Sequence, residues 1–146
     1  MTTSESTGKF TTADYPLAER RPDAVRGRGG KGLDEITLAA VMDGSIGLED
    51  LSITSQALRQ QADIARSAGR STLAENFERA AELVDIPQDT IMRIYELLRP
   101  GRAKSKEELI GVATELQKTH GAELLARFVV EAAEVYERRG LFKNRF

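Results

Sequence analysis

The stretch from Asn76 to Pro100 constrains the fold most, because apolar residues recur there at helical spacing between clear start and stop signals. A first helix begins near Ser71 and continues into this stretch. Pro87 stands where a helix-initiating proline belongs, and Pro100-Gly101 ends the second helix. The pattern predicts two helices whose apolar faces pack through Phe77, Ala81, Ile91 and Leu98.

Helix signals also occur on both sides of this stretch. Thr54 or Ser55 offers a cap for a helix to about Ala68, although the apolar face of this helix is thin. Ser105 and Glu108 have the spacing of a capping box, and a final helix spans about residues 122–139. We find no strand-like alternation over four residues or more. The sequence predicts an all-α fold with four main helices, short helical pieces, an extended N-terminal arm and a Gly-rich loop.

Four segments are expected along the chain. Residues 1–13 are rich in Ser and Thr and are predicted to be disordered, and residues 14–33 to form the extended arm and the Gly-rich loop. The glycines of this loop lack the spacing and the preceding strand of a phosphate-binding loop, so we interpret the segment as a plain loop. Residues 34–140 are expected to form the helical domain, and residues 141–146 a C-terminal tail.

The composition excludes several kinds of chemistry. The chain has no Cys and one His, His120, so it cannot supply a thiolate or imidazole-rich metal site by itself. Its carboxylates mostly form i, i+4 pairs with Arg, as on a solvated helix face. We therefore expect no catalytic, cofactor-binding or metal-binding residue. The sequence also lacks a secretory signal and an apolar run of membrane-spanning length, so a cytoplasmic location is expected.

Two non-enzymatic alternatives remain open on the residues alone. The chain could be a free-standing helical adaptor that binds other proteins. Less favoured is a helix-turn-helix DNA-binding protein formed by residues 55–85, because its second helix is mostly acidic and the net charge is −2. A basic cluster lies instead in an interhelical loop, at Arg99, Arg102, Lys104 and Lys106.

Several blocks of residues are nevertheless familiar as a collinear series. They are Asp14-Tyr15-Pro16-Leu17-Ala18, Gln61-Ala62 with Ile64-Ala65, Asn76-Phe77 with Arg79-Ala80-Ala81-Glu82-Leu83, Ile86-Pro87, Leu97-Leu98-Arg99-Pro100, and Phe128-Val129 with Glu131-Ala132-Ala133. In this order they resemble the small (gamma) subunit of the adenosylcobalamin-dependent diol and glycerol dehydratases. The resemblance covers roughly residues 14–139.

The resemblance implies a subunit of a hydro-lyase that converts glycerol or propane-1,2-diol to an aldehyde and water by a radical mechanism. In that family a large TIM-barrel subunit holds the diol, and adenosylcobalamin lies between the large and medium subunits of a heterohexamer. The small subunit is implied to bind and stabilise the large subunit without catalytic or cofactor-binding residues. No nucleic-acid or membrane partner is implied.

The substrate and the precise location stay open at this point. The short segment before Asp14 is similar to the glycerol dehydratase type, but the residues that contact substrate lie in another chain. Association with a bacterial microcompartment stays open, although residues 1–13 lack the pattern of an amphipathic targeting helix.

Partner contacts are expected in three regions: the arm at 14–22, the block at 76–100, and the last helix, which has more apolar residues than one stripe needs. Tyr and Arg are enriched at interface hot spots. Tyr95 also falls on the same helix face as Ile91 and Leu98, and this position favours a core role instead. The predicted interface residues are Tyr15, Arg79, Tyr95 and Arg99.

Overall fold

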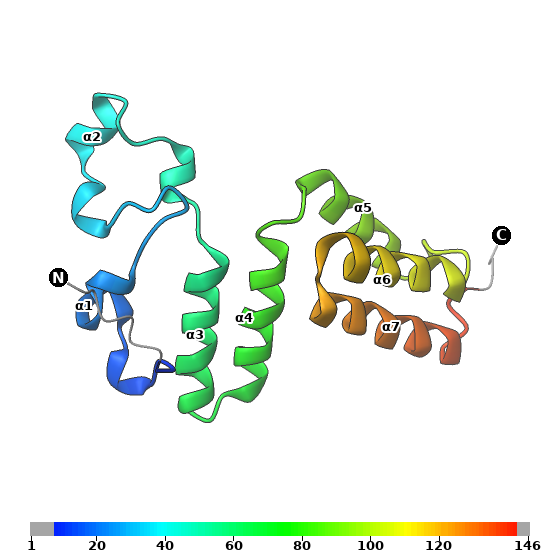
Figure 1. The fold of residues 1–146 in the computed structure, drawn as a ribbon. Coiled ribbons are helices and arrows are strands. Elements are labelled where there is room, and N and C mark those ends of the chain that lie inside the picture. The colour runs from blue at the N-terminus through cyan, green and yellow to red at the C-terminus, as the bar shows by residue number, and fades with distance from the viewer. Residues whose placement is uncertain (1–7, 143–146) are drawn as a thin grey trace. The chain divides into compact units, whose positions relative to one another are not determined.

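The computed structural model describes residues 8–142, and this part of the chain is helical without a named strand. Five helices have 11 to 16 residues: α3 (Ser55–Ser67), α4 (Ser71–Leu83), α5 (Gln88–Leu98), α6 (Lys106–His120) and α7 (Glu123–Arg138). Before them come α1 (Leu17–Arg20), α2 (Leu38–Met42) and the 3-10 turns η1 (Thr12–Asp14), η2 (Pro22–Ala24), η3 (Leu33–Glu35) and η4 (Leu48–Leu51) (Figure 1). The all-α prediction is confirmed.

The predicted number of four main helices is one too few for this part of the chain. The helix with the thin apolar face, α3, forms in full because its small residues pack closely against a neighbour. Ala62 and Ala65 of α3 and Ala74 of α4 are buried together, with Leu73 and Phe77 against them. Tertiary burial of this kind, rather than local propensity, supplies most of the stability of a helix in a protein.

The chain divides into two compact units, Met1–Ala81 and Glu82–Phe146. The boundary lies inside α4, whose last two residues belong to the second unit. The four segments expected from the sequence stay a prediction. Residues 1–7, from the segment predicted to be disordered, and residues 143–146, from the predicted tail, lie outside the described residues.

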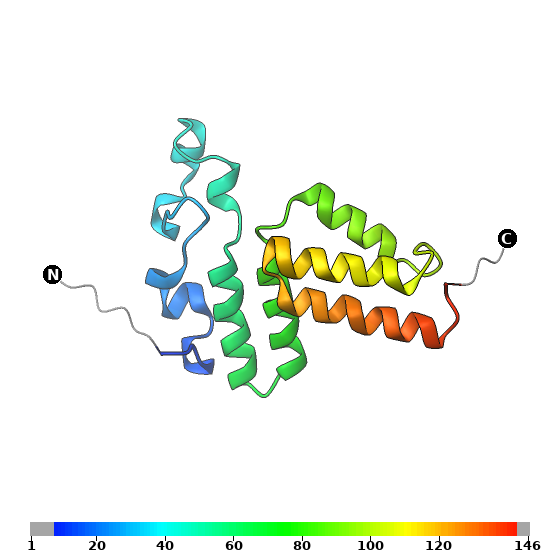
Figure 2. The same ribbon diagram turned by 45° about the vertical axis from the view of Figure 1, so that its right-hand side comes forward.

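In the first unit α3 and α4 lie side by side and antiparallel (Figures 1 and 2). Gly69 follows α3 with a φ of +74°, the left-handed conformation expected of a glycine after a helix. Arg66 of α3 pairs with Glu78 of α4 at 2.8 Å. On α3, Ser67 Oγ accepts a hydrogen bond of 3.1 Å from the backbone N–H of Thr12, so η1 is fixed to the same helix.

The predicted N-terminal arm contains short helical turns. Thr11 caps η1, and Asp14 accepts a hydrogen bond of 2.8 Å from the Thr11 backbone N–H. Tyr15 has extended backbone, as expected before a proline, and the Tyr15–Pro16 peptide bond is cis. The apolar side chain of this segment that becomes buried is Leu17.

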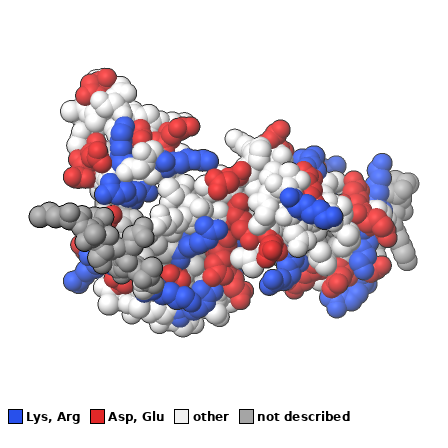
Figure 3. Space-filling model, viewed as in Figure 1, with Lys and Arg blue, Asp and Glu red and all other residues white. Residues whose placement is uncertain are grey.

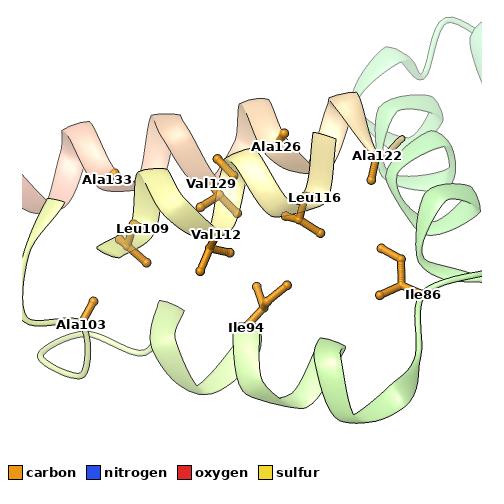
Figure 4. Packing of buried hydrophobic residues seen from close by; sticks show 11 residues of the cluster. Ile86, Ile94, Ala103, Leu109, Val112, Leu116, Ala122, Ala126, Val129 and Ala133 are labelled. Atoms are coloured by element: carbon orange, nitrogen blue, oxygen red, sulfur yellow. The ribbon is translucent and has the colours of Figure 1, made fainter. Parts of the chain in front are cut away.

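The second unit has its own core between α5, α6 and α7. Figure 4 shows Leu109, Val112 and Leu116 of α6 facing Val129 of α7 and Ile94 of α5, with Ile86 and Ala103 at the two ends. Leu109 and Val129 are the largest side chains with almost no exposure. Tyr136 of α7 donates a hydrogen bond to the backbone carbonyl of Leu98, the last residue of α5.

The expectation that the two helices on either side of Pro87 pack on each other is wrong. Phe77 of α4 packs against the small cluster that α4 shares with α3. Ile91 and Leu98 of α5 pack against the core formed with α6 and α7. The periodicity therefore identified two buried faces correctly, but each face is buried by a different neighbour.

The ends of α6 agree with the sequence except in one bond. Ser105 accepts the backbone N–H of Glu108 at 3.2 Å, as a capping residue does, and Gly121 ends the helix with a φ of +62°. The Glu108 carboxylate accepts the backbone N–H of Lys104 at 2.8 Å, one residue before the position that a capping box predicts.

Within residues 8–142 no helix is both long enough and apolar enough to cross a bilayer.

Candidate protein interface

The second unit contains an apolar pocket of about 200 Å³. The side chains around it come from the end of α4, the connection to α5, and from α5, α6 and α7: Leu83, Ile86, Ile91, Ile94, Tyr95, Leu98, Leu116, Leu125, Phe128 and Val129. Most of them belong to the core of the unit, so the pocket is an extension of that core to the surface. Such a site fits an apolar side chain of a partner.

Two aromatic rings stand where the pocket meets solvent. Tyr95 of α5 is 62% exposed and Phe128 of α7 is 45% exposed, although both line the pocket. The alternative in which Tyr95 is a core residue therefore does not describe this structure. Its ring is available to a partner, and large amphipathic rings beside an apolar depression are typical of interface hot spots.

Arg99 follows Tyr95 by one helical turn and caps the end of α5. Its guanidinium pairs with Glu96 at 3.1 Å and is half exposed. Tyr95 and Arg99 therefore lie together at the C-terminal half of α5, and both are accessible. Whether they contact a partner stays a prediction.

The other two predicted interface residues lie in the first unit. Tyr15 is exposed at the end of η1. Arg79 is half-buried on α4, where it donates a hydrogen bond to the side chain of Asn76 one turn earlier. The four predicted residues thus divide into two in each unit, and their role at an interface stays a prediction.

One structural contact of the block at 76–100 was not predicted from the sequence. The carboxylate of Glu82 accepts backbone N–H groups at the start of α7, from Leu124 at 2.9 Å and from Leu125 at 2.8 Å. Ala122, the N-cap residue of α7, makes no side-chain capping bond. Glu82 therefore supplies the missing cap from 42 residues away along the sequence, and its negative charge also suits a helix N-terminus.

The basic cluster that could have supported nucleic-acid binding is partly paired within the chain. Arg99 and Arg102 both pair with Glu96, and Lys106 pairs with Glu137 at 2.7 Å. Figure 3 shows Lys and Arg interspersed with Asp and Glu over the visible face. A phosphate backbone would have to compete with these carboxylates, and this competition weakens the cluster as an electrostatic footprint for DNA.

The residues also do not fit a site for the corrin cofactor that the family resemblance implies. Within the described range, no three His, Cys, Asp or Glu side chains gather in a way that could hold a metal ion. The apolar pocket offers neither a nitrogen ligand nor the polar groups that orient a large cofactor, and its volume is below the ordinary range of cofactor sites. His120, the last residue of α6, does not line this pocket.

Comparison with known proteins shows similarity to the small subunits of dehydratases. The family model described as dehydratase small subunit matches residues 10–143. The propanediol dehydratase small subunit of Citrobacter freundii is 45% identical over 141 residues, which is 97% of this chain and 80% of that protein. The propanediol dehydratase small subunit of Salmonella typhimurium is 46% identical over 132 residues, which is 90% of this chain and 76% of that protein. The chain therefore belongs to the dehydratase small-subunit family, and it is a subunit of an enzyme.

Proposed function

We propose that this chain is the non-catalytic small subunit of an adenosylcobalamin-dependent diol dehydratase, and that it binds and stabilises the large subunit. The observation that carries the proposal is the identity of about 45% to two propanediol dehydratase small subunits over most of the chain. The holoenzyme would be a cytoplasmic heterohexamer of large, medium and small subunits. It would convert propane-1,2-diol or glycerol to the corresponding aldehyde and water by a radical mechanism.

The relatives' names favour propane-1,2-diol as the substrate of the complex. This differs from the glycerol type that the short segment before Asp14 resembled. Because the diol and the cofactor are proposed to lie on other subunits, no residue of this chain takes part in the chemistry. When bound there, adenosylcobalamin supplies the radical that starts the reaction, and this chain's residues act only through assembly.

The pocket of the second unit supports a direct role in assembly. Tyr95 and Phe128 flank an apolar depression whose floor is already ordered by the core of α5, α6 and α7. A side chain inserted there would need little rearrangement of this unit, and preorganisation of this kind favours affinity. Arg99 lies next to the same surface and could pair with a carboxylate of the large subunit.

Co-expression of the three subunits with a tag on the large subunit tests the proposal. The wild-type chain should remain bound through gel filtration. Tyr95→Ala and Arg99→Ala should each weaken retention about tenfold or more, as hot-spot truncations do, while the melting temperature of the chain changes little. Glu75→Gln, an exposed carboxylate of α4, is the matched control.

Two results would count against the proposal. A wild-type chain that elutes alone in the presence of both other subunits would remove the function. Retention and melting that are unchanged in Tyr95→Ala and Arg99→Ala would leave the function but remove this surface as the interface.

A further inference from the structure

The segment from η3 to Ile53 exposes most of its apolar side chains. Leu48 is 84% exposed, Met42 is 79% exposed and Leu38 is 78% exposed, values that leave these side chains almost fully in water. Leu33, Val41, Leu51 and Ile53 are exposed as well. This concentration over about 20 residues is unlike the scattered single apolar residues of an ordinary surface.

The helix α2 within this segment has no buried residue. It has five residues, and an isolated helix of that length is not stable in water. Leu38, Val41 and Met42 lie at offsets of zero, three and four, so they share one helix face, and that face is exposed. The buried apolar side chain of the segment is Ile46, which is 7% exposed. Burial within the chain therefore does not account for the order of this segment.

Polar contacts with the Gly-rich loop hold the segment instead. Lys31 donates to the backbone carbonyl of Ser45 and pairs with Asp50 at 3.4 Å. The backbone N–H of Arg28 donates to the carbonyl of Ser52 at 3.3 Å. Gly27 lies so close to Asp50 that a Cβ there would overlap the Asp50 carbonyl oxygen. Gly27 thus allows close backbone packing, and the loop holds the segment at 33–53 in place.

All charged side chains within the segment itself are acidic, while the adjoining loop carries Arg26, Arg28 and Lys31. Residues 33–53 contain five acidic residues and no Lys or Arg. Two of the carboxylates, those of Glu35 and Asp50, face Arg26 and Lys31 of the loop. Within residues 8–142 the remaining three, Asp34, Asp43 and Glu49, have no ion pair.

We infer that residues 33–53 form a docking surface for an apolar patch on the large dehydratase subunit. Lys or Arg residues of the large subunit would surround that patch and face the carboxylates of this chain. The inference rests on the proposed function and adds a second contact region, in the first unit, to the pocket of the second. A second copy of this chain is disfavoured as the occupant, because a two-fold contact would bring the same acidic rim against itself.

The experiment uses the complex of the three subunits. A photo-crosslinking amino acid at position 48, which is exposed in the chain, should yield a product with the large subunit. The same probe at Lys118, an exposed residue of α6 outside the proposed contact regions, is the control for random collision. A product with the medium subunit, a product with a second copy of this chain, or no product above the control would overturn the inference.

Two sets of variants test the chemistry of the surface. The double substitution Leu38→Ser with Met42→Ser should weaken retention on the tagged large subunit by about tenfold to a hundredfold, because two apolar side chains no longer leave water on binding. Glu49→Lys should weaken retention more than Glu49→Gln, and the difference should shrink at high salt. Equal retention of Glu49→Lys and Glu49→Gln on the large subunit would exclude Lys or Arg residues of that subunit as the partners of these carboxylates.

The outcomes separate this inference from the proposed function. A wild-type chain that fails to bind the large subunit removes both. A wild-type chain that binds, together with serine variants that bind equally well and melt at the same temperature, removes only the docking surface at 33–53. Because the substituted side chains are exposed, these variants are expected to keep the helical circular dichroism of the wild type.

Discussion

The carboxylate of Glu82 accepts the backbone N–H of Leu124 at 2.9 Å with one oxygen, and its other oxygen accepts the next N–H of α7. An acidic residue at the end of one helix thereby caps the start of another. The two bonds fix the point from which α7 enters the core of the second unit. They also explain why a carboxylate stands in the block at 76–100 at a position that helix periodicity does not require.

Removal of this cap should destabilise the second unit. Glu82→Ala leaves two N–H groups of α7 without their acceptor, and loss of a cap costs about 0.5–2 kcal/mol. Glu82→Gln keeps one carbonyl oxygen and should lie between Ala and the wild type. Urea denaturation measures the free energy of unfolding, and Glu75→Ala on the exposed part of α4 should change it by less than about 0.5 kcal/mol. A Glu82→Ala variant as stable as that control would contradict the capping role.

Two leucines in different settings should respond differently to the same truncation. Leu109→Ala opens a cavity in the core of the second unit, where this side chain is 0% exposed, and should cost about 2–5 kcal/mol. Leu48→Ala removes an exposed side chain and should change the free energy of unfolding of the isolated chain by less than about 0.5 kcal/mol. A large loss for Leu48→Ala in the isolated chain would mean that Leu48 is buried there, which would also contradict the docking surface at 33–53.

Two glycines should likewise respond with opposite signs to alanine. At Gly27 an added Cβ would overlap the backbone oxygen of Asp50, so Gly27→Ala should loosen the contact between the loop and η4. Amide hydrogen exchange should then accelerate at Arg28, whose backbone N–H donates to the Ser52 carbonyl. Gly111 lies within α6 with open space around it, and Gly111→Ala should stabilise the chain by up to about 1 kcal/mol. Unchanged exchange in Gly27→Ala would show that the loop and η4 can separate without loss of order.

The segment at 33–53 should also depend on pH. The Gly47 backbone N–H and the Lys31 ammonium hold the pKa of Asp50 below its ordinary value of 3.8, and hydrogen bonds from Ser45 do the same for the pKa of Asp43. A lowered folded-state pKa means that the carboxylate stabilises the fold above about pH 4 and loses this effect as the pH falls through the folded-state pKa. Amide protection at Gly47 and Ser45, corrected for intrinsic exchange, should therefore fall below about pH 4 and stay flat from pH 5 to 8. In Asp50→Ala the acid-dependent loss at Gly47 should be absent.

The helices were predictable from sequence because their signals are local. Ser105 as a cap, Gly69 and Gly121 as terminators, and the apolar spacing of α5 all act within a few residues. The partners of the helices were not predictable in the same way. Phe77 and Ile91 have similar patterns around them, yet they pack into different clusters, because the neighbour that buries a helix face comes from distant parts of the chain.

The candidate interfaces were predictable only in part. Tyr95 was proposed from its residue type, and its exposure beside the pocket agrees with that role. The surface around Leu38 and Leu48 was missed because a short apolar run looks the same whether it is buried or exposed. The capping role of Glu82 was missed because its partners are 42 and 43 residues away.

The boundary between the two units falls within α4, between Ala81 and Glu82. A fragment that began at Glu82 would keep the carboxylate that caps α7 but would lose the preceding turns of the helix that orients it. Residues at a chain terminus are poorly ordered, so the Glu82 carboxylate of such a fragment would no longer be held in place. The backbone N–H groups at the start of α7 would then lose their fixed acceptor. Neither half of the chain can therefore be separated cleanly from the other, and α4 is a shared part that any truncation, domain exchange or fusion of this subunit has to leave whole.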